Sequence, residues 1–213
     1  MINITTFEEG LPISIVIPTT TKREKFFNEM VLPMAEYNMP RQIIVVCDEG
    51  NACKQRNIGL SHVTEPYVLF LDDDVLLPQN YLTTLYEAIN DFDVAYTGYV
   101  GIVLNPHTQP NHNFRIKTID FDYEKLKKQN YISTMSLIKT SCLKDVCWDE
   151  NIKRLQDWDL WLALYKKGCT FVAVHGIEFY AFYNDEGLTS NKNISYQEAY
   201  NIIKNKHNLY ETK

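Results

Sequence analysis

The sequence has no run of apolar residues long enough to cross a membrane, and its first ten residues contain Glu8 and Glu9 but no apolar segment. A secretory signal needs an apolar segment of about 7–15 residues, and a membrane-spanning helix needs about 20. We therefore expect neither a signal peptide nor a transmembrane segment. We expect a protein that works in the cytoplasm.

An excess of positive charge is also missing, since 27 acidic residues outnumber 21 basic ones and the formal net charge is −6. This balance argues against a protein that binds nucleic acid by neutralising its phosphates.

The five cysteines are odd in number and scattered, which favours a reducing compartment over a disulfide framework. No internal repeat is visible, and 213 residues with 45% hydrophobic content fit one domain with a substantial core.

The most informative stretch runs from Tyr67 to Val75, where an apolar segment is followed by Asp72, Asp73 and Asp74. The segment is typical of a buried central strand, which places the three acids at its carboxyl end. Ligands of open α/β sheets bind at that edge. Because adjacent carboxylates repel one another, we expect a cation beside them, and a divalent metal carrying a phosphorylated substrate fits oxygen ligands best.

The remaining segments alternate between strand and helix patterns. We expect strands over residues 12–18, 41–47, 67–71, 94–104, 131–138, 170–174 and 177–183, and helices over residues 26–38, 51–61, 78–89, 155–167 and 195–207. Pro33 should kink or split the first helix. The order predicts an α/β fold with a Rossmann-like, mostly parallel central sheet flanked by helices.

Five short segments share an order that is characteristic of one enzyme family. They are Ile17-Pro18-Thr19, Val46-Cys47-Asp48, Arg56-Asn57-x-Gly59, Leu69-Phe70-Leu71-Asp72-Asp73-Asp74 and Leu155-Gln156-Asp157-Trp158-Asp159-Leu160-Trp161. With these segments the chain resembles family-2 glycosyltransferases of the GT-A fold over about residues 13–190. The resemblance implies a single GT-A-type domain over residues 1–213. Within it, about 11–104 would bind the nucleotide sugar, about 105–190 the acceptor, and 191–213 would form a C-terminal helix.

The same resemblance implies an activity. A metal-dependent, inverting glycosyltransferase would move a sugar from a nucleotide-diphosphate donor, with a UDP-sugar expected, to a hydroxyl of a glycan or glycoconjugate acceptor, as in polysaccharide biosynthesis. Asp72-Asp73-Asp74 is similar to the DXD motif, so Asp74 and Asp72 are the expected ligands of Mn²⁺ or Mg²⁺. Asp72 and Asp73 are also expected to contact the donor.

Further donor-binding residues follow from the resemblance. Pro18 and Thr19 would line the nucleotide pocket, and Asp48 would contact the base or ribose. Arg56 and Asn57 match the helix segment that faces the nucleotide.

Asp157 is the expected catalytic base, because it matches the second acid of the Glu-Asp pair of the family, in which Gln156 here replaces the first. Inversion needs one carboxylate on the face opposite the leaving group, and a base can deprotonate the acceptor hydroxyl. We expect the amino end of its helix to keep Asp157 ionised. Trp158 and Trp161 could stack on a sugar, although their helical spacing is more typical of a core.

Other interpretations of the same residues stay open. Asp48 and Asp157 could be helix N-caps. A strand ending in Asp-x-Asp also occurs in phosphatases of the haloacid-dehalogenase type, where Asp72 would be the nucleophile. A sugar nucleotidyltransferase is disfavoured, because the first turn lacks the expected glycines. A non-catalytic nucleotide-sugar-binding module and a peripheral membrane contact through the lysines near Lys127 are the remaining alternatives.

Overall fold

The structure is a computed structural model, and it describes residues 1–104, 112–183 and 194–209. The described strands are β1 (Ile2–Thr6), β2 (Leu11–Thr19), β3 (Pro40–Cys47), β4 (Tyr67–Phe70), β5 (Val75–Leu76), β6 (Val94–Val103), β7 (Phe114–Ile116), β8 (Leu137–Lys139) and β9 (Phe171–Tyr183). The α-helices are α1 (Glu24–Phe26), α2 (Leu32–Tyr37), α3 (Ala52–Leu60), α4 (Tyr81–Ala88), α5 (Tyr123–Leu126), α6 (Gln156–Lys166) and α7 (Tyr196–His207). Short 3₁₀ turns, η1 (Thr21–Arg23) and η3 (Thr140–Leu143), and a π-helical segment, η2 (Phe27–Val31), complete the described elements.

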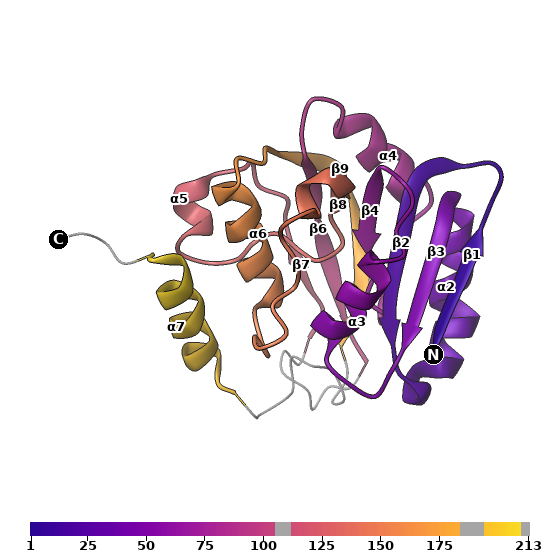
Figure 1. The fold of residues 1–213 in the computed structure, drawn as a ribbon, viewed down its shortest axis with the longest axis horizontal. Helices are drawn as coiled ribbons and strands as arrows, with labels where there is room; N and C mark the ends of the chain where they lie inside the picture. The colour runs from indigo at the N-terminus through magenta and orange to yellow at the C-terminus, as the bar shows by residue number, and fades with distance from the viewer. Residues whose placement is uncertain (105–111, 184–193, 210–213) are drawn as a thin grey trace.

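All nine described strands belong to one sheet, in the order β1-β3-β2-β4-β8-β6-β9-β5, with β7 paired to β6 (Figure 1). The β3–β2–β4 part and the β6–β9 pair are parallel, as predicted for a nucleotide-binding sheet. The other pairings are antiparallel, so the sheet as a whole is mixed rather than mostly parallel. The predicted α/β class is confirmed.

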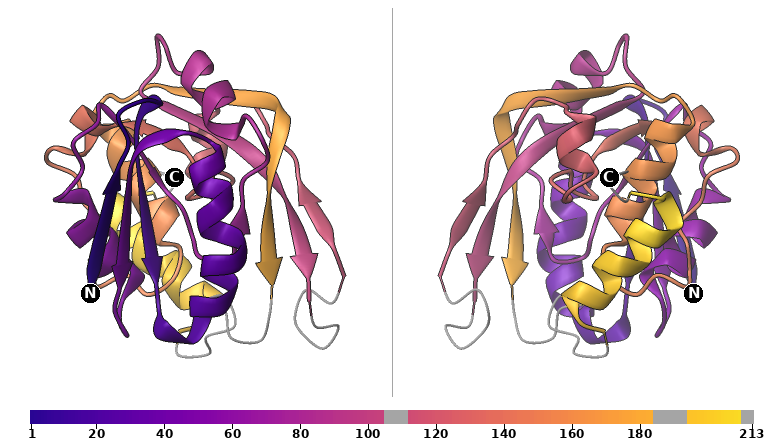
Figure 2. Two further views of the ribbon diagram at one scale, coloured as in Figure 1. Left: turned by 90° about the vertical axis from the view of Figure 1, so that its right-hand side faces the viewer. Right: turned by 90° about the vertical axis from the view of Figure 1, so that its left-hand side faces the viewer.

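The two faces of the sheet bury separate apolar clusters, because successive residues of a strand point to opposite faces. Val16 of β2 packs in the cluster that includes Trp158 and Trp161 of α6. Its neighbours Ile15 and Ile17 pack in the cluster covered by η2 and α4. Figure 2 shows α6 and α7 together on one side of the sheet and the first helical segments on the other. Burial on both faces explains the unbroken apolar run of the central strands.

Several helix predictions hold in detail. Pro33 lies in the first turn of α2, directly after the π-helical segment η2, so the regular α-helix is interrupted where the proline was expected to disturb it. Helix α7 begins with a full capping box, in which Ser195 accepts from the Glu198 amide and Glu198 accepts from the Ser195 amide. Gly168 follows α6 with φ of 93°, as expected of a glycine that ends a helix.

Two strand predictions were wrong. The strand expected over residues 131–138 is reduced to β8, because residues 131–136 form loop structure that supports α6. The strands expected over 170–174 and 177–183 are one strand, β9, which shifts register against β6 between Tyr96 and Gly98.

Of the polar stretch over residues 105–129, residues 105–111 lie outside the described part and the rest contains β7 and α5. Within the described ranges, no helix combines the length and apolar content that crossing a membrane requires.

Candidate active site

The three acids lie in the turn between β4 and β5, at the carboxyl end of the sheet where the sequence places them. The chain continues beside β2 for one residue after β4, since the Leu71 amide donates to the Val16 carbonyl. It then turns, with the Val75 amide donating to the Asp72 carbonyl. The end of β2 is therefore adjacent to the acids.

Arg23, a residue that the sequence analysis did not select, forms ion pairs with two of these acids. Its Nη1 atom lies 2.5 Å from Asp73 Oδ1 and 2.9 Å from Asp74 Oδ2. The Thr19 hydroxyl donates to Asp73 Oδ2 at 2.8 Å, as its place at the end of β2 allows. Burial raises the pKa of Asp73 in spite of these partners. Burial and the neighbouring charge of Asp72 together raise the pKa of Asp74 to about 6.

Arg56 holds the first acid of the triplet. Its Nη2 atom donates to Asp72 Oδ1 at 2.6 Å, and its Nη1 atom donates to Gln156 Oε1 at 3.2 Å. The guanidinium also lies over the Trp148 ring, 4.5 Å from the centroid. Its Nε atom is buried without a hydrogen-bond partner. Arg56 therefore connects the acid turn to the start of α6 with a side chain that is only 5% exposed.

Helix α3 can present Arg56 in this way because it lies very close to β2. Asn51 caps the helix by accepting from the Cys53 amide. At Gly59 a Cβ atom would lie 2.3 Å from a Val16 methyl, so only glycine permits this approach. Asn51, rather than Asp48, is the N-cap of α3.

Asp157 lies in the first turn of α6, two residues after Leu155, the residue at the N-cap position. Asn130 Nδ2 donates to its Oδ2 atom at 2.7 Å, and the Trp158 amide donates to its Oδ1 atom at 2.9 Å. Burial raises its pKa to about 6, and the negative charge of Asp72 adds to this, while Arg56 opposes it. Burial thus opposes the ionised form that the amino end of the helix was expected to favour, although a pKa of about 6 still leaves Asp157 mostly ionised at neutral pH.

Two tyrosines not selected from the sequence lie in the electrostatic field of these acids. The Tyr99 and Tyr183 hydroxyls are 3.3 Å apart, on the paired strands β6 and β9. Burial raises the pKa of both, and Asp157 contributes for Tyr99 whereas Asp74 and Asp72 contribute for Tyr183. Strands that are distant from the acid turn in sequence thus bring two hydroxyl groups to the same site.

The residues expected to bind the nucleotide are only partly brought together. Pro18 and Thr19 are buried at the end of β2, and Asp48 is exposed directly after the adjacent strand β3. The Asp48 backbone amide donates to the Thr19 carbonyl at 3.2 Å. The side-chain amide of Gln55 donates to the backbone carbonyl groups of Thr19 and of Asp48. Asn57 instead anchors the loop after η3: its amide donates to the Trp148 carbonyl and accepts from the Trp148 amide.

The two tryptophans of α6 belong to the core and are not a sugar platform. Trp158 and Trp161 are both fully buried. Their indole N–H groups donate to the Leu126 and Ile132 carbonyls, at 2.6 and 2.9 Å. They fix the position of α6, and with it the position of Asp157.

The acid triplet fits a hard divalent cation by its chemistry. It offers only carboxylate oxygens, the ligand type that Mg²⁺ and Mn²⁺ prefer. Three carboxylates face two guanidinium groups, so one negative charge is left without a paired cation. The raised pKa of Asp74 reflects this surplus of negative charge together with burial.

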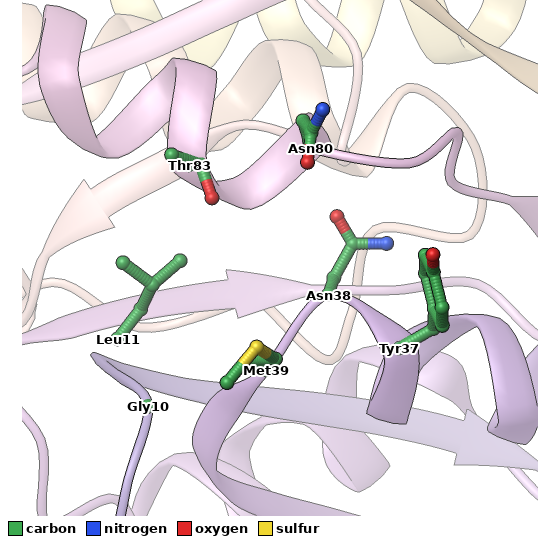
Figure 3. A pocket seen from close by; sticks show the side chains of 7 residues that line it. All are labelled: Gly10, Leu11, Tyr37, Asn38, Met39, Asn80 and Thr83. Carbon is green, nitrogen blue, oxygen red and sulfur yellow. The ribbon is translucent and has the colours of Figure 1, made fainter.

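A small cavity elsewhere in the molecule does not belong to this site. It measures about 220 Å³ and is lined by residues such as Leu11, Tyr37, Met39 and Asn80 (Figure 3). Leu11 begins β2 and Met39 precedes β3, so the cavity lies at the opposite end of the parallel strands from the acids. None of the predicted site residues lines it.

Comparison with known proteins connects this geometry to one family and one fold. The sequence model of glycosyl transferase family 2 matches residues 28–147, more than half of the chain. The matched part includes Asp48, Arg56, Asn57 and the acid triplet, but not Thr19 or Asp157. No curated protein matches the chain.

Solved structures of S. aureus TarS have a similar fold. TarS 1-349 in complex with UDP-GlcNAc superposes with a TM-score of 0.67 and is 18% identical, over 91% of this chain and 65% of that one. TarS 1-349 in complex with UDP gives a TM-score of 0.59 at 18% identity, over 83% and 62%. The chain therefore spans somewhat less than two thirds of these relatives, and at this identity the likeness shows the fold alone.

Proposed function

Because the chain belongs to glycosyl transferase family 2, we propose that it transfers a sugar from a nucleoside-diphosphate donor to an acceptor hydroxyl. The observation that supports this most strongly is the meeting of two groups at one edge of the sheet. Asp72 at the donor end and Asp157 at the acceptor end both neighbour Arg56, and the charge of Asp72 acts on Asp157. Inversion needs one carboxylate as a base on the acceptor side, and carboxylates on the donor side can hold a cation at the diphosphate.

The donor would lie along the ends of β2, β3 and β4. Thr19 and Pro18 form the floor at the end of β2, and exposed Asp48 is free of side-chain partners in the described contacts and faces outward for the ribose or base. A UDP-sugar is the proposed donor, since the TarS structures are complexes with UDP and UDP-GlcNAc. The acceptor is proposed to be a glycan or glycoconjugate hydroxyl.

Asp74 and Asp72 would hold the divalent cation, Mn²⁺ or Mg²⁺, with Asp73 kept in place by Thr19 and Arg23. When bound, such a cation neutralises negative charge on the leaving diphosphate, so that a general acid is not needed. The protein itself contributes Arg56, a buried cation held by Asp72, Gln156 and the Trp148 ring. It lies between the donor acids and Asp157.

Asp157 would act as the base that accepts the proton of the acceptor hydroxyl, with inversion at the sugar carbon. Its pKa of about 6 keeps it largely ionised at neutral pH and gives it more basicity than an ordinary carboxylate. Asn130 and the Trp158 amide fix the orientation of its two oxygens.

The five cysteines are all free thiols, which supports our proposal that the enzyme works in the reducing cytoplasm.

A transfer assay with UDP-sugars and Mn²⁺ or Mg²⁺ tests this proposal. Release of UDP that depends on both the cation and an added glycan acceptor would support it. Cation-dependent UDP binding without release from any donor would instead indicate a non-catalytic nucleotide-sugar-binding module. Hydrolysis of simple phosphate esters with labelling of Asp72 would indicate the phosphatase alternative, which membership in this family disfavours.

A further inference from the structure

Arg23 occupies the position between two of the acids that are available to a metal. A single nitrogen, Nη1, contacts both Asp73 and Asp74, at 2.5 and 2.9 Å. The arginine belongs to η1, a single 3₁₀ turn that follows β2 directly. Its guanidinium is thus a monovalent counter-ion for the carboxylates that the donor site needs.

The two arginines of the site differ in how firmly they are held. The Arg56 side chain is 5% exposed, lies over Trp148 and also donates to Gln156. The Arg23 side chain is 20% exposed, and its described side-chain partners are Asp73 and Asp74 alone. Arg56 is fixed by three different groups, whereas Arg23 is held only by the charges that a cation would also seek.

A divalent cation and the Arg23 guanidinium repel each other, because both are positive and both would lie next to Asp74. A cation bound alone must therefore displace Arg23 or bear that repulsion. A diphosphate changes the balance, since it brings negative oxygens with which a guanidinium forms strong bidentate contacts. The long arginine side chain can turn from the acids to such a group without movement of the sheet.

We propose that Arg23 is a donor-binding residue that exchanges partners during donor binding. In the donor-free protein it neutralises Asp73 and Asp74, and when cation and donor bind together it moves to the diphosphate. This inference rests on the proposed nucleotide-sugar function. It predicts that cation binding is weak without a nucleotide and strong with one.

The test compares Arg23→Met and Arg23→Lys with the wild-type chain at pH 8. Binding of Mn²⁺ alone is followed by the electron paramagnetic resonance signal of the free ion, and binding of UDP at saturating Mn²⁺ by calorimetry. We expect Arg23→Met to bind Mn²⁺ alone about tenfold more tightly and UDP about tenfold more weakly, each about 1.4 kcal/mol. Arg23→Lys keeps the charge, so its affinity for Mn²⁺ alone should stay within about threefold of wild type.

Arg41→Met is the matched control, because Arg41 pairs with Glu65 at 3.8 Å, with a side chain that is 46% exposed, far from the acids. It should change neither affinity, and thermal melting checks that each variant is folded. If Arg23→Met binds Mn²⁺ alone no more tightly than wild type, the exchange is refuted while the proposed function stands. If wild type, Arg23→Met and Arg41→Met all fail to bind UDP at saturating Mn²⁺, the metal-dependent function itself is refuted, and the exchange with it.

Discussion

Replacing Asp157 by Asn should make the protein more stable and less active at the same time. In the folded chain the Asp157 pKa is about 6, compared with an ordinary value of 3.8. The ionised group therefore destabilises the fold by about 3 kcal/mol at high pH, at 1.36 kcal/mol for each pH unit of difference. Asn is neutral and removes this cost. The Asn side chain has one oxygen for the two donors, Asn130 and the Trp158 amide, so one hydrogen bond is lost. This loss reduces the gain in stability by about 1 kcal/mol.

The net gain should be about 2 kcal/mol at pH 8, measured as the free energy of unfolding in urea. The sign follows from the raised pKa: the cost is complete above pH 6, shrinks as the pH falls and is absent below 3.8. At pH 4.5 the two proteins should be about equally stable. The turnover rate should fall by about 100-fold or more with UDP affinity unchanged, since a general base contributes 10²–10⁴.

The wild-type rate should also decline below about pH 6, by about tenfold for each pH unit, as Asp157 takes up its proton. Asp145→Asn is the control, because that acid is 78% exposed and should affect neither rate nor stability beyond about 0.5 kcal/mol. A variant Asp157→Asn that is less stable than wild type at pH 8 would refute the assignment of a burial cost. Unchanged turnover would remove Asp157 from the role of base.

Three further substitutions test two contacts that build the site and one that only stabilises the fold. Arg56→Ala leaves Asp72 without its ion-pair partner, so the unfolding free energy should fall by about 2–3 kcal/mol and UDP binding should be lost. Gly59→Ala places a methyl group 2.3 Å from Val16, and the urea midpoint should drop by the equivalent of about 2 kcal/mol. Ser195→Ala removes the capping box of α7 at a cost of about 1 kcal/mol, with no change in UDP affinity. An unchanged urea midpoint in any of these variants would contradict the corresponding contact.

Much of the fold follows from local patterns in the sequence. The capping box at Ser195 and Gly168 after α6 mark helix ends by local hydrogen bonding, and the structure has both. The direction of strand pairing could not be predicted in the same way. β8 and β9 depend on partners far along the chain, and the register shift of β9 against β6 between Tyr96 and Gly98 has no local signal.

Residues of the candidate site could be predicted from the sequence where they follow a strand or begin a helix. Asp72 and Asp157 carry such signals, and both lie in the site. Arg23 sits in a polar segment after β2 that looks like an ordinary turn, and its role depends on acids 50 and 51 residues away. Tyr99 and Tyr183 come together only through the pairing of β6 and β9, which no short motif encodes.

The acid triplet and the ends of β2 and β3 are proposed to form a cation-dependent site for a nucleoside diphosphate. The most direct measurement is the melting temperature of the wild-type chain and of Asp74→Asn with UDP, GDP or ADP, each with and without Mn²⁺. A ligand that binds only the folded state at 100 times its Kd stabilises it by about 2.7 kcal/mol, which shifts melting by several degrees. We predict that UDP with Mn²⁺ raises the melting temperature of wild type, and that Asp74→Asn loses this rise. No rise with any of the three nucleotides, or an equal rise in Asp74→Asn, would show that this site does not bind nucleoside diphosphates through Asp74 and a cation.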